Sequence, residues 1–467
     1  MKNQTTSYSH HHSPLHELQI LVCAVALLFA SSGAVFAEEV TLYLQSANTA
    51  EGQNSIVAYN RMSDGDLVPI AGSPFLTGGT GIDNDTNGKL GPNDNDTPIV
   101  QSADGKRLFA VNGHSNSIAV FDILDGGALR HVKGSPFPSM GVGPVSLAMS
   151  GDFLLVANRN EDPHQLDELR GAVNANYVSF RVQPDGRLSF VSRVEVADGQ
   201  KPTQVLVSQR DPSIVFGNEF QVDADFDGEG SVSRLFSNEP AVRGRLRTMR
   251  LDSQGRLSST NAIDLIETAE PAPDVPSVPL GIWDHPQKNI LYVGFVTRNQ
   301  LGVYRYDNDG NLAFLTATPN SGQDICWLRV NDDGTRLYAV NNLPRDERMD
   351  DASTVTVFDI DGEKAGDPVE IDRVALPLPL GTFVNNRNIP QPNSTAFQLD
   401  IDPSGKLLWV LAQRINQTDA NESDLGNILH VLRIDRRGKL SVLHSRHLAQ
   451  DGVHPRARPQ GIVTQAI

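Results

Sequence analysis

Short runs of alternating apolar and polar residues, separated by tight polar turns, recur along most of the chain. The clearest copies are residues 97–112 and 324–341, and each of them reads as two strands joined by a turn that contains Asp-Gly. Alternation with a period of two between Gly-containing turns predicts β-strands. A third alternating segment follows each pair, for example 117–122 and 354–359, and then a further turn and a short fourth strand. The repeated unit therefore predicts a four-stranded antiparallel sheet.

The two ends of the chain complete each other. Residues 40–45 and 55–59 look like second and third strands of a unit that lacks a first strand, and residues 459–464 look like a first strand with no partner after it. Pairing the two ends completes a seventh unit and hides strand edges that would otherwise promote aggregation. The pattern predicts an all-β fold, a single seven-bladed β-propeller over residues 38–467, closed by its N- and C-terminal strands.

The long connections all have the same topological position. In such a blade the turns between strands one and two, and between strands three and four, lie on one face, which we call the bottom; here they are tight Gly turns. The insertions fall on the other two connections, which open on the opposite face, the top: residues 77–96, 159–174, 219–243, 268–277, 343–353, 376–393, 413–426 and 450–458. Long loops on one side of a rigid scaffold are a usual place for binding or catalysis. The alternative is that they are variable surface loops without a role.

The N-terminal segment predicts export. Lys2 precedes an unbroken apolar run over residues 20–29, and residues 30–37 end in Val35 and Ala37, as at a signal-peptide cleavage site. The apolar run is about half the ~20 residues that a membrane-spanning helix needs. We therefore expect residues 1–37 to be a signal peptide and the protein to be periplasmic or secreted, without a membrane span.

The charge of the chain limits the classes of binding partner, and its cysteine content limits disulfide formation. The formal net charge is −17, with 56 acidic residues against 39 Lys and Arg, and this repels nucleic acids and anionic membranes. Cleavage would remove Cys23 and leave Cys326 alone, so no intramolecular disulfide is expected. The expected partner is a small-molecule ligand or an extracytoplasmic protein.

Two acidic insertions have the spacing of calcium-binding loops. Oxygen-bearing side chains occupy loop positions one, three, five and twelve in the first, with Gly88 at position six, and the second has the same opening. This spacing wraps oxygen ligands around one Ca²⁺ ion. Asp94 is shorter than the usual Glu, and metal-free Asp/Asn/Gly turns are the alternative. The candidate Ca²⁺ ligands are Asp83, Asp85, Asn87, Asp94, Asp223, Asp225 and Asp227.

Charged and imidazole side chains are expected at the top of the ring, beside the central channel. A carboxylate surrounded by Arg and His can act as a general base or help to bind an anionic substrate, although salt bridges at the rim are the alternative. The candidates for catalysis are Glu219, Arg159, His164 and Arg298. The candidates for ligand binding are His114, Lys201, Asp324, Arg345, Arg414 and Arg458.

The blade motifs resemble those of the lactonase-like seven-bladed propellers. The motifs are the repeated Asp-Gly-x-x-Leu-(Tyr/Phe)-x-Val-Asn unit, the Ser-Ile-x-Val-Phe-Asp strand, and Gly-Ser-Pro-Phe at 72–75 and 134–137. That family includes 6-phosphogluconolactonases, carboxymuconate cyclases and cycloisomerase-2-like proteins, so the resemblance implies a YVTN-like repeat and lactone chemistry. Members that act on acidic lactones carry Arg or His just after the Pro that starts an inner strand. This chain has Val145, Thr203, Leu280 and Gln460 there.

Two functions remain open at this point. The favoured one is a binding scaffold that presents an acidic top rim, with Ca²⁺ as its candidate cofactor. The alternative is a hydrolase of sugar or other lactones in which Glu219 is the general base.

Overall fold

The fold is taken from a computed structural model that describes Met1 and residues 40–82, 96–159, 175–196, 200–221, 244–265, 279–343, 353–384, 390–414 and 426–466. All of the β-structure described lies in one compact unit, Val40–Ile467. The predicted signal peptide lies, apart from Met1, outside the described residues.

Residues 40–466 form seven antiparallel blades of four strands each, arranged as a seven-bladed β-propeller. Blade 1 joins the two ends of the chain: β32 (Ile462–Ala466), β1 (Val40–Gln45), β2 (Ser55–Arg61) and β3 (Leu67–Pro69), with β4 (Phe75–Leu76) also paired to β2. Blade 2 has β5 (Ile99–Gln101), β6 (Arg107–Asn112), β7 (Ser117–Ile123) and β8 (Leu129–His131), with β9 (Phe137–Pro138) paired to β7. Blade 3 has β10 (Pro144–Ser150), β11 (Phe153–Asn158), β12 (Asn176–Val182) and β13 (Leu188–Glu195).

The remaining blades follow in chain order. Blade 4 has β14 (Gln200–Val207), β15 (Ile214–Gln221), β16 (Arg245–Leu251) and β17 (Leu257–Asp264). Blade 5 has β18 (Pro279–Asp284), β19 (Ile290–Phe295), β20 (Gln300–Tyr306) and β21 (Leu312–Pro319). Blade 6 has β22 (Gln323–Val330), β23 (Arg336–Leu343), β24 (Thr354–Asp359) and β25 (Val369–Ala375). Blade 7 has β28 (Ser394–Ile401), β29 (Leu407–Arg414), β30 (Ile428–Ile434) and β31 (Leu440–His447).

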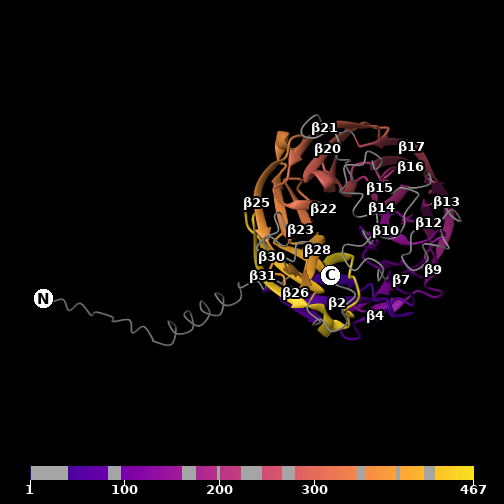
Figure 1. The fold of residues 1–467 in the computed structure, drawn as a ribbon. Helices are drawn as coiled ribbons and strands as arrows, with labels where there is room; N and C mark the ends of the chain where they lie inside the picture. Colours follow the sequence, from indigo (N-terminus) through magenta and orange to yellow (C-terminus); the bar gives the residue numbers. More distant parts are fainter. Residues whose placement is uncertain are drawn as a thin grey trace. The chain divides into compact units, whose positions relative to one another are not determined.

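The ring closes as the sequence predicts. β1 pairs antiparallel with β32, from Val40 opposite Ala466 to Leu44 opposite Ile462. The first strands of neighbouring blades contact one another in an unbroken circle around the centre, whereas fourth strands such as β13 and β21 lie at the outside (Figure 1). The closing strand runs from Ile462, slightly later than the expected 459–464.

The bottom turns are tight, as predicted. Glycines in the turns between strands one and two, and between strands three and four, have positive φ, for example 67° at Gly105 and 84° at Gly186. This region of backbone space is costly for residues with a Cβ atom, which explains the Asp-Gly and similar pairs in the sequence.

The long connections begin and end at the top. Since the strands of each blade alternate in direction, strand two ends and strand three begins on the side opposite the tight turns. Most residues of these connections lie outside the described part. One exception is the predicted loop 376–393, which contains a small hairpin of β26 (Leu380–Val384) and β27 (Pro390–Pro392). Short 3₁₀ turns occur at η1 (Asp125–Gly127), η2 (Val296–Arg298), η4 (Gly362–Ala365) and η5 (Leu448–Asp451).

The hydrophobic core lies between the blades. Within the described residues each hydrophobic cluster combines mainly two neighbouring blades. Leu42 and Tyr59 of blade 1 pack with Trp409 and Val431 of blade 7, for example. Every blade is therefore covered on both faces, which is why its second strand is almost wholly apolar and buried.

The protonation of Asp284 makes the stability of the interface between blades 4 and 5 depend on pH. Its side chain is fully buried at the bottom end of β18 and accepts hydrogen bonds from Ser208 Oγ (2.8 Å), Gln209 N (2.8 Å) and the Tyr306 hydroxyl (2.9 Å). Burial raises the pKa of Asp284 from 3.8 to about 6, although these hydrogen bonds oppose the shift. The folded state therefore retains a proton between pH 4 and pH 6 that the unfolded chain has lost.

We expect the Asp284→Asn variant to expose this dependence. Below pH 4 the contribution of Asp284 to stability is complete, and as the pH rises through 6 about 3 kcal/mol of it is lost. Urea unfolding at pH 4 and pH 7.5 should show wild type losing about that much relative to the variant. Asp307→Asn is the control, because backbone and side-chain hydrogen bonds lower the pKa of the exposed Asp307 carboxyl. Its pH effect should have the opposite sign. A pH-independent difference between wild type and Asp284→Asn would contradict the prediction.

Candidate functional site

The described candidate residues lie at the top ends of strands one or two, in the connection that follows strand two or, for Arg458, in the connection that leads into strand one. His114 follows β6, Arg159 follows β11, Arg298 ends η2 after β19, and Arg458 precedes β32. Lys201, Glu219, Asp324 and Arg414 lie within β14, β15, β22 and β29. Every blade thus contributes at least one ionisable side chain to the top of the ring.

Five of these eight side chains are almost completely buried. Their exposed fractions are 3% for Arg159, 0% for Glu219, 5% for Asp324, 1% for Arg414 and 4% for Arg458. The other three, His114, Lys201 and Arg298, are half-buried. Buried charges cost free energy unless they are paired, so proteins keep them mainly where they support a structure or a function.

Glu219 forms an ion pair inside the interface between blades 3 and 4. Arg247 donates from Nε to Glu219 Oε1 (2.5 Å) and from Nη2 to Oε2 (3.2 Å), and from Nη1 to Ser259 Oγ (2.9 Å). Tyr177 of blade 3 is close by. Burial and the negative charge of Glu219 raise the pKa of Tyr177, while Arg247 opposes this shift. The two parallel contacts from one guanidinium hold the carboxylate in a fixed position.

Backbone contacts hold the neighbouring candidates in place. The backbone N–H of Asp324 donates to Asn299 Oδ1 (2.7 Å), and Asp324 has a φ of 57°, an unusual value for a residue with a side chain. The N–H of Arg414 donates to Asn427 Oδ1 (2.8 Å). These contacts thus fix the backbone of two charged residues at the top ends of their strands.

The remaining candidates lie outside the described residues. These are His164 and Arg345, and the predicted calcium ligands Asp83, Asp85, Asn87, Asp94, Asp223, Asp225 and Asp227. In the ranges that the structure describes, no group of three or more His, Cys, Asp or Glu residues is arranged to hold a metal ion.

The asparagines that end the second strands have a role that the sequence did not reveal. Each one ends or nearly ends a strand and is fully buried: Asn112, Asn158, Asn218 and Asn341. Asn341 donates from Nδ2 to Thr354 Oγ1 (2.9 Å), and its Oδ1 accepts from Asn320 Nδ2 (2.7 Å). Asn158 Nδ2 donates to Asn176 Oδ1 (2.9 Å). Their recurrence at one position of the repeat was the available signal.

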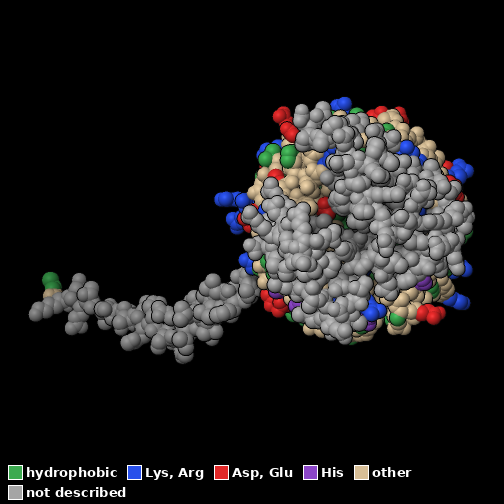
Figure 2. Space-filling view, viewed as in Figure 1, with side chains coloured by type: hydrophobic (Ala, Val, Ile, Leu, Met, Phe, Trp, Pro, Cys, Tyr) green, Lys and Arg blue, Asp and Glu red, His purple; other side chains and the backbone are tan. Residues whose placement is uncertain are grey.

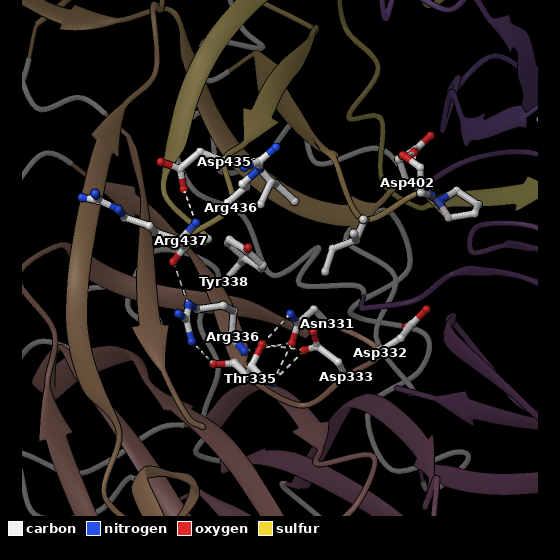
Figure 3. Close-up of a pocket in the computed structure, with 16 residues that line it drawn as sticks. Asn331, Asp332, Asp333, Thr335, Arg336, Tyr338, Asp402, Asp435, Arg436 and Arg437 are labelled. Atoms are coloured by element: carbon white, nitrogen blue, oxygen red, sulfur yellow. Dashed lines mark hydrogen bonds between the residues drawn. The ribbon is translucent and has the colours of Figure 1, made fainter. Parts of the chain in front are cut away.

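A pocket of about 370 Å³ lies on the bottom face between blades 6 and 7 (Figure 3). Its charged groups already have partners within the turns. Asp333 accepts from Thr335 N (3.0 Å), Asp435 accepts from Arg437 N (2.7 Å), and Arg336 Nε donates to Arg437 O (2.9 Å). Asp332 points away from this network in Figure 3. The hydrogen bonds are those of ordinary turns.

The described surface is charged and mixed. Around the edge of the ring in Figure 2, Lys and Arg side chains alternate with Asp and Glu, and few hydrophobic groups are visible. Among the residues that the structure places, no helix has the length and apolar character needed to cross a membrane.

Solved structures with the same fold include lactonase-like propellers, although no protein-family model and no curated protein matches the sequence. A candidate 6-phosphogluconolactonase of Bacteroides fragilis has a TM-score of 0.60 at 15% identity, over 93% of this chain and 100% of that chain. The periplasmic gluconolactonase PpgL of Pseudomonas aeruginosa has a TM-score of 0.59 at 16% identity, over 92% and 99%. A candidate 6-phosphogluconolactonase of Bacteroides uniformis has a TM-score of 0.58 at 16% identity, over 92% and 99%.

Proposed function

We propose that this protein is an exported, lactonase-like propeller that binds a small uncharged ligand at the top of its ring, and that sugar lactones are the ligand class to test first. The observation that carries the proposal is the ring of ionisable side chains at the top, one or more from each blade, five of them at most 5% exposed. Buried charged groups that converge on one end of a scaffold are typical of functional sites. The fold shared with lactonase-like propellers supports the ligand class.

Charge favours a neutral ligand over a phosphorylated one. The net charge of −17 disfavours the approach of anions over the whole surface. The four inner-strand positions where acid-binding relatives carry Arg or His hold Val145, Thr203, Leu280 and Gln460, which carry no charge.

Calorimetric titration with glucono-δ-lactone and with 6-phosphogluconolactone tests the ligand class. We expect the neutral lactone to bind at least tenfold more tightly than the phosphorylated one. Arg414→Met should weaken its binding, since a buried Arg that is paired or bonded to a ligand contributes about 1.5–3 kcal/mol per charged hydrogen bond. The exposed Arg130→Met is the matched control. Equal affinities for the two lactones, or an equal effect of the two Arg variants, would contradict the proposal.

Hydrolysis is the second candidate function, with Glu219 as general base. The bidentate contact with Arg247 weighs against it, because the guanidinium already contacts both carboxylate oxygens of Glu219. A hydrolysis assay on neutral lactones decides between the two. If turnover is found in wild type and is lost when both members of the ion pair are replaced by apolar residues, the catalytic function is favoured.

Export and calcium binding complete the proposal, and both rest on the sequence. N-terminal sequencing of protein from an expressing cell should give a mature chain that starts at Glu38. Millimolar Ca²⁺ should raise the melting temperature by several degrees through mass action, and Asp83→Asn with Asp85→Asn should abolish the shift. Equal shifts in wild type and the double variant would assign the effect to other residues.

A further inference from the structure

Besides the pocket of Figure 3, a second cavity lies in the central channel, separate from the candidate residues at the top of the ring. It has a volume of about 380 Å³ and is bounded by first strands of blades 1, 2, 3, 5, 6 and 7. It reaches the bottom face, where Asp332, Ile401 and Pro403 also border the pocket of Figure 3. None of the candidate residues at the top lines it. The volume lies within the usual range of small-molecule sites.

Residues 96 and 97 line this cavity where the chain leads into β5. The N–H of Asp96 donates to Thr203 O of blade 4 (3.2 Å), and Thr97 O accepts from Leu147 N of blade 3 (2.9 Å). Thr97 has a φ of 56°, which is costly for a β-branched residue. The segment that leads into β5 is therefore fixed across the inner edges of two other blades and places the Asp96 side chain in the cavity wall.

Four buried polar atoms of the cavity residues make no hydrogen bond to any described residue. Two are acceptors, Asp96 Oδ2 and Gln101 Oε1, and two are donors, Trp283 Nε1 and Trp327 Nε1. A buried polar atom without a partner costs about 1–3 kcal/mol, so unsatisfied groups in one place need an explanation. Asp96 as a whole is only 7% exposed.

The Arg329–Asp400 ion pair in the cavity wall does not require a charged ligand, because each member already has its counter-charge. Arg329 is already paired with Asp400 (2.9 Å), and its guanidinium lies over the ring of Trp283, 4.5 Å from the centroid. Asp400 also accepts from Thr464 N and Oγ1 (3.0 Å each). Asp96 accepts from Thr97 Oγ1 at Oδ1 (3.2 Å), which leaves Oδ2 for a hydroxyl donor. Apolar side chains such as Leu399 and Ile462 form much of the remaining wall.

We propose that the lower part of the central channel is a binding site for an uncharged polyhydroxylated small molecule. A hydroxyl group both donates and accepts, so one ligand with several hydroxyls can satisfy Asp96 and Gln101 as well as the two indole N–H groups. The apolar remainder of the wall fits the carbon skeleton of such a molecule. This site is distinct from the proposed lactone site, and either can exist without the other.

Intrinsic fluorescence provides a direct test, since the chain has three tryptophans and two of them line the cavity. Sorbitol is titrated up to about 100 mM, with hexane-1,6-diol as a probe of similar chain length and fewer hydroxyls. We expect a saturable change with sorbitol and at least fivefold weaker binding of the diol, because hydrogen bonds are lost. A merely linear response to sorbitol, or equal binding of the two probes, would overturn the proposal.

Trp327→Phe and Trp409→Phe form a matched pair of variants. Both remove a buried indole N–H without a described partner, but Trp409 lies in the core between blades 7 and 1, away from the cavity. Trp327→Phe should weaken sorbitol binding about five- to tenfold, and Trp409→Phe should leave it unchanged. Asp96→Leu should weaken it to a similar extent. If Asp96→Leu fails to fold, the tryptophan pair decides alone, and equal affinities of those two variants would refute the site.

Discussion

A chain that ends at Gln460 is expected to lose its cooperative folding. The deletion removes β32, so the inner edge of β1 loses its partner strand along Val40–Leu44. Asp400 loses the two donors on Thr464, and the cluster between blades 1 and 7 loses Ile462. Together these losses are comparable with the whole free energy of unfolding of an ordinary domain, about 5–15 kcal/mol. An exposed inner edge also promotes association between chains.

Size-exclusion chromatography and thermal unfolding check this expectation. The truncated chain should elute as aggregates and lack the sharp unfolding transition of the full chain. A chain that lacks only Ile467 is the matched control, since it retains all of β32 and should behave as wild type. A monomeric truncated chain that melts within a few degrees of the full chain would show that the ring does not depend on its closing strand.

Glu219→Gln is expected to destabilise the protein by about 3–5 kcal/mol, because it leaves the Arg247 guanidinium buried without its counter-charge. Both side chains are less than 10% exposed, and their contact is bidentate. Surface pairs such as Arg187–Asp185, in which both partners are exposed, should contribute far less to stability. Urea unfolding at constant pH gives the difference in free energy.

The double variant Glu219→Leu, Arg247→Met separates stability from function. Replacing both members of a buried pair by apolar residues is often close to neutral, so we expect this variant to unfold within about 2 kcal/mol of wild type. It can then be used in the lactone assays without ambiguity about folding. A single variant that costs less than about 1 kcal/mol would mean that Glu219 and Arg247 do not act as a buried pair.

Local sequence patterns predicted most of the fold. Alternating strands and Gly turns predicted seven blades and the pairing of the chain ends, because strand alternation and positive φ are properties of neighbouring residues. The same logic placed His114, Lys201, Asp324 and Arg458 at the top, since each adjoins the top end of a strand. Most residues of the long insertions, and all of the predicted calcium ligands, lie outside the described residues, so these predictions stay predictions.

The contacts within the site depended on residues far apart in the chain. Arg247 contacts Glu219 from the neighbouring strand of blade 4, and Tyr177 lies close to the pair from blade 3. Asp96 lines a cavity together with Trp327 and Thr464 because the ring brings its first strands to a common axis. By itself the sequence determined the strands, their turns and the closure of the ring, which follow from local backbone preferences. Only the tertiary structure decided which buried polar groups are paired and which face the channel, because burial and partnership come from packing between blades.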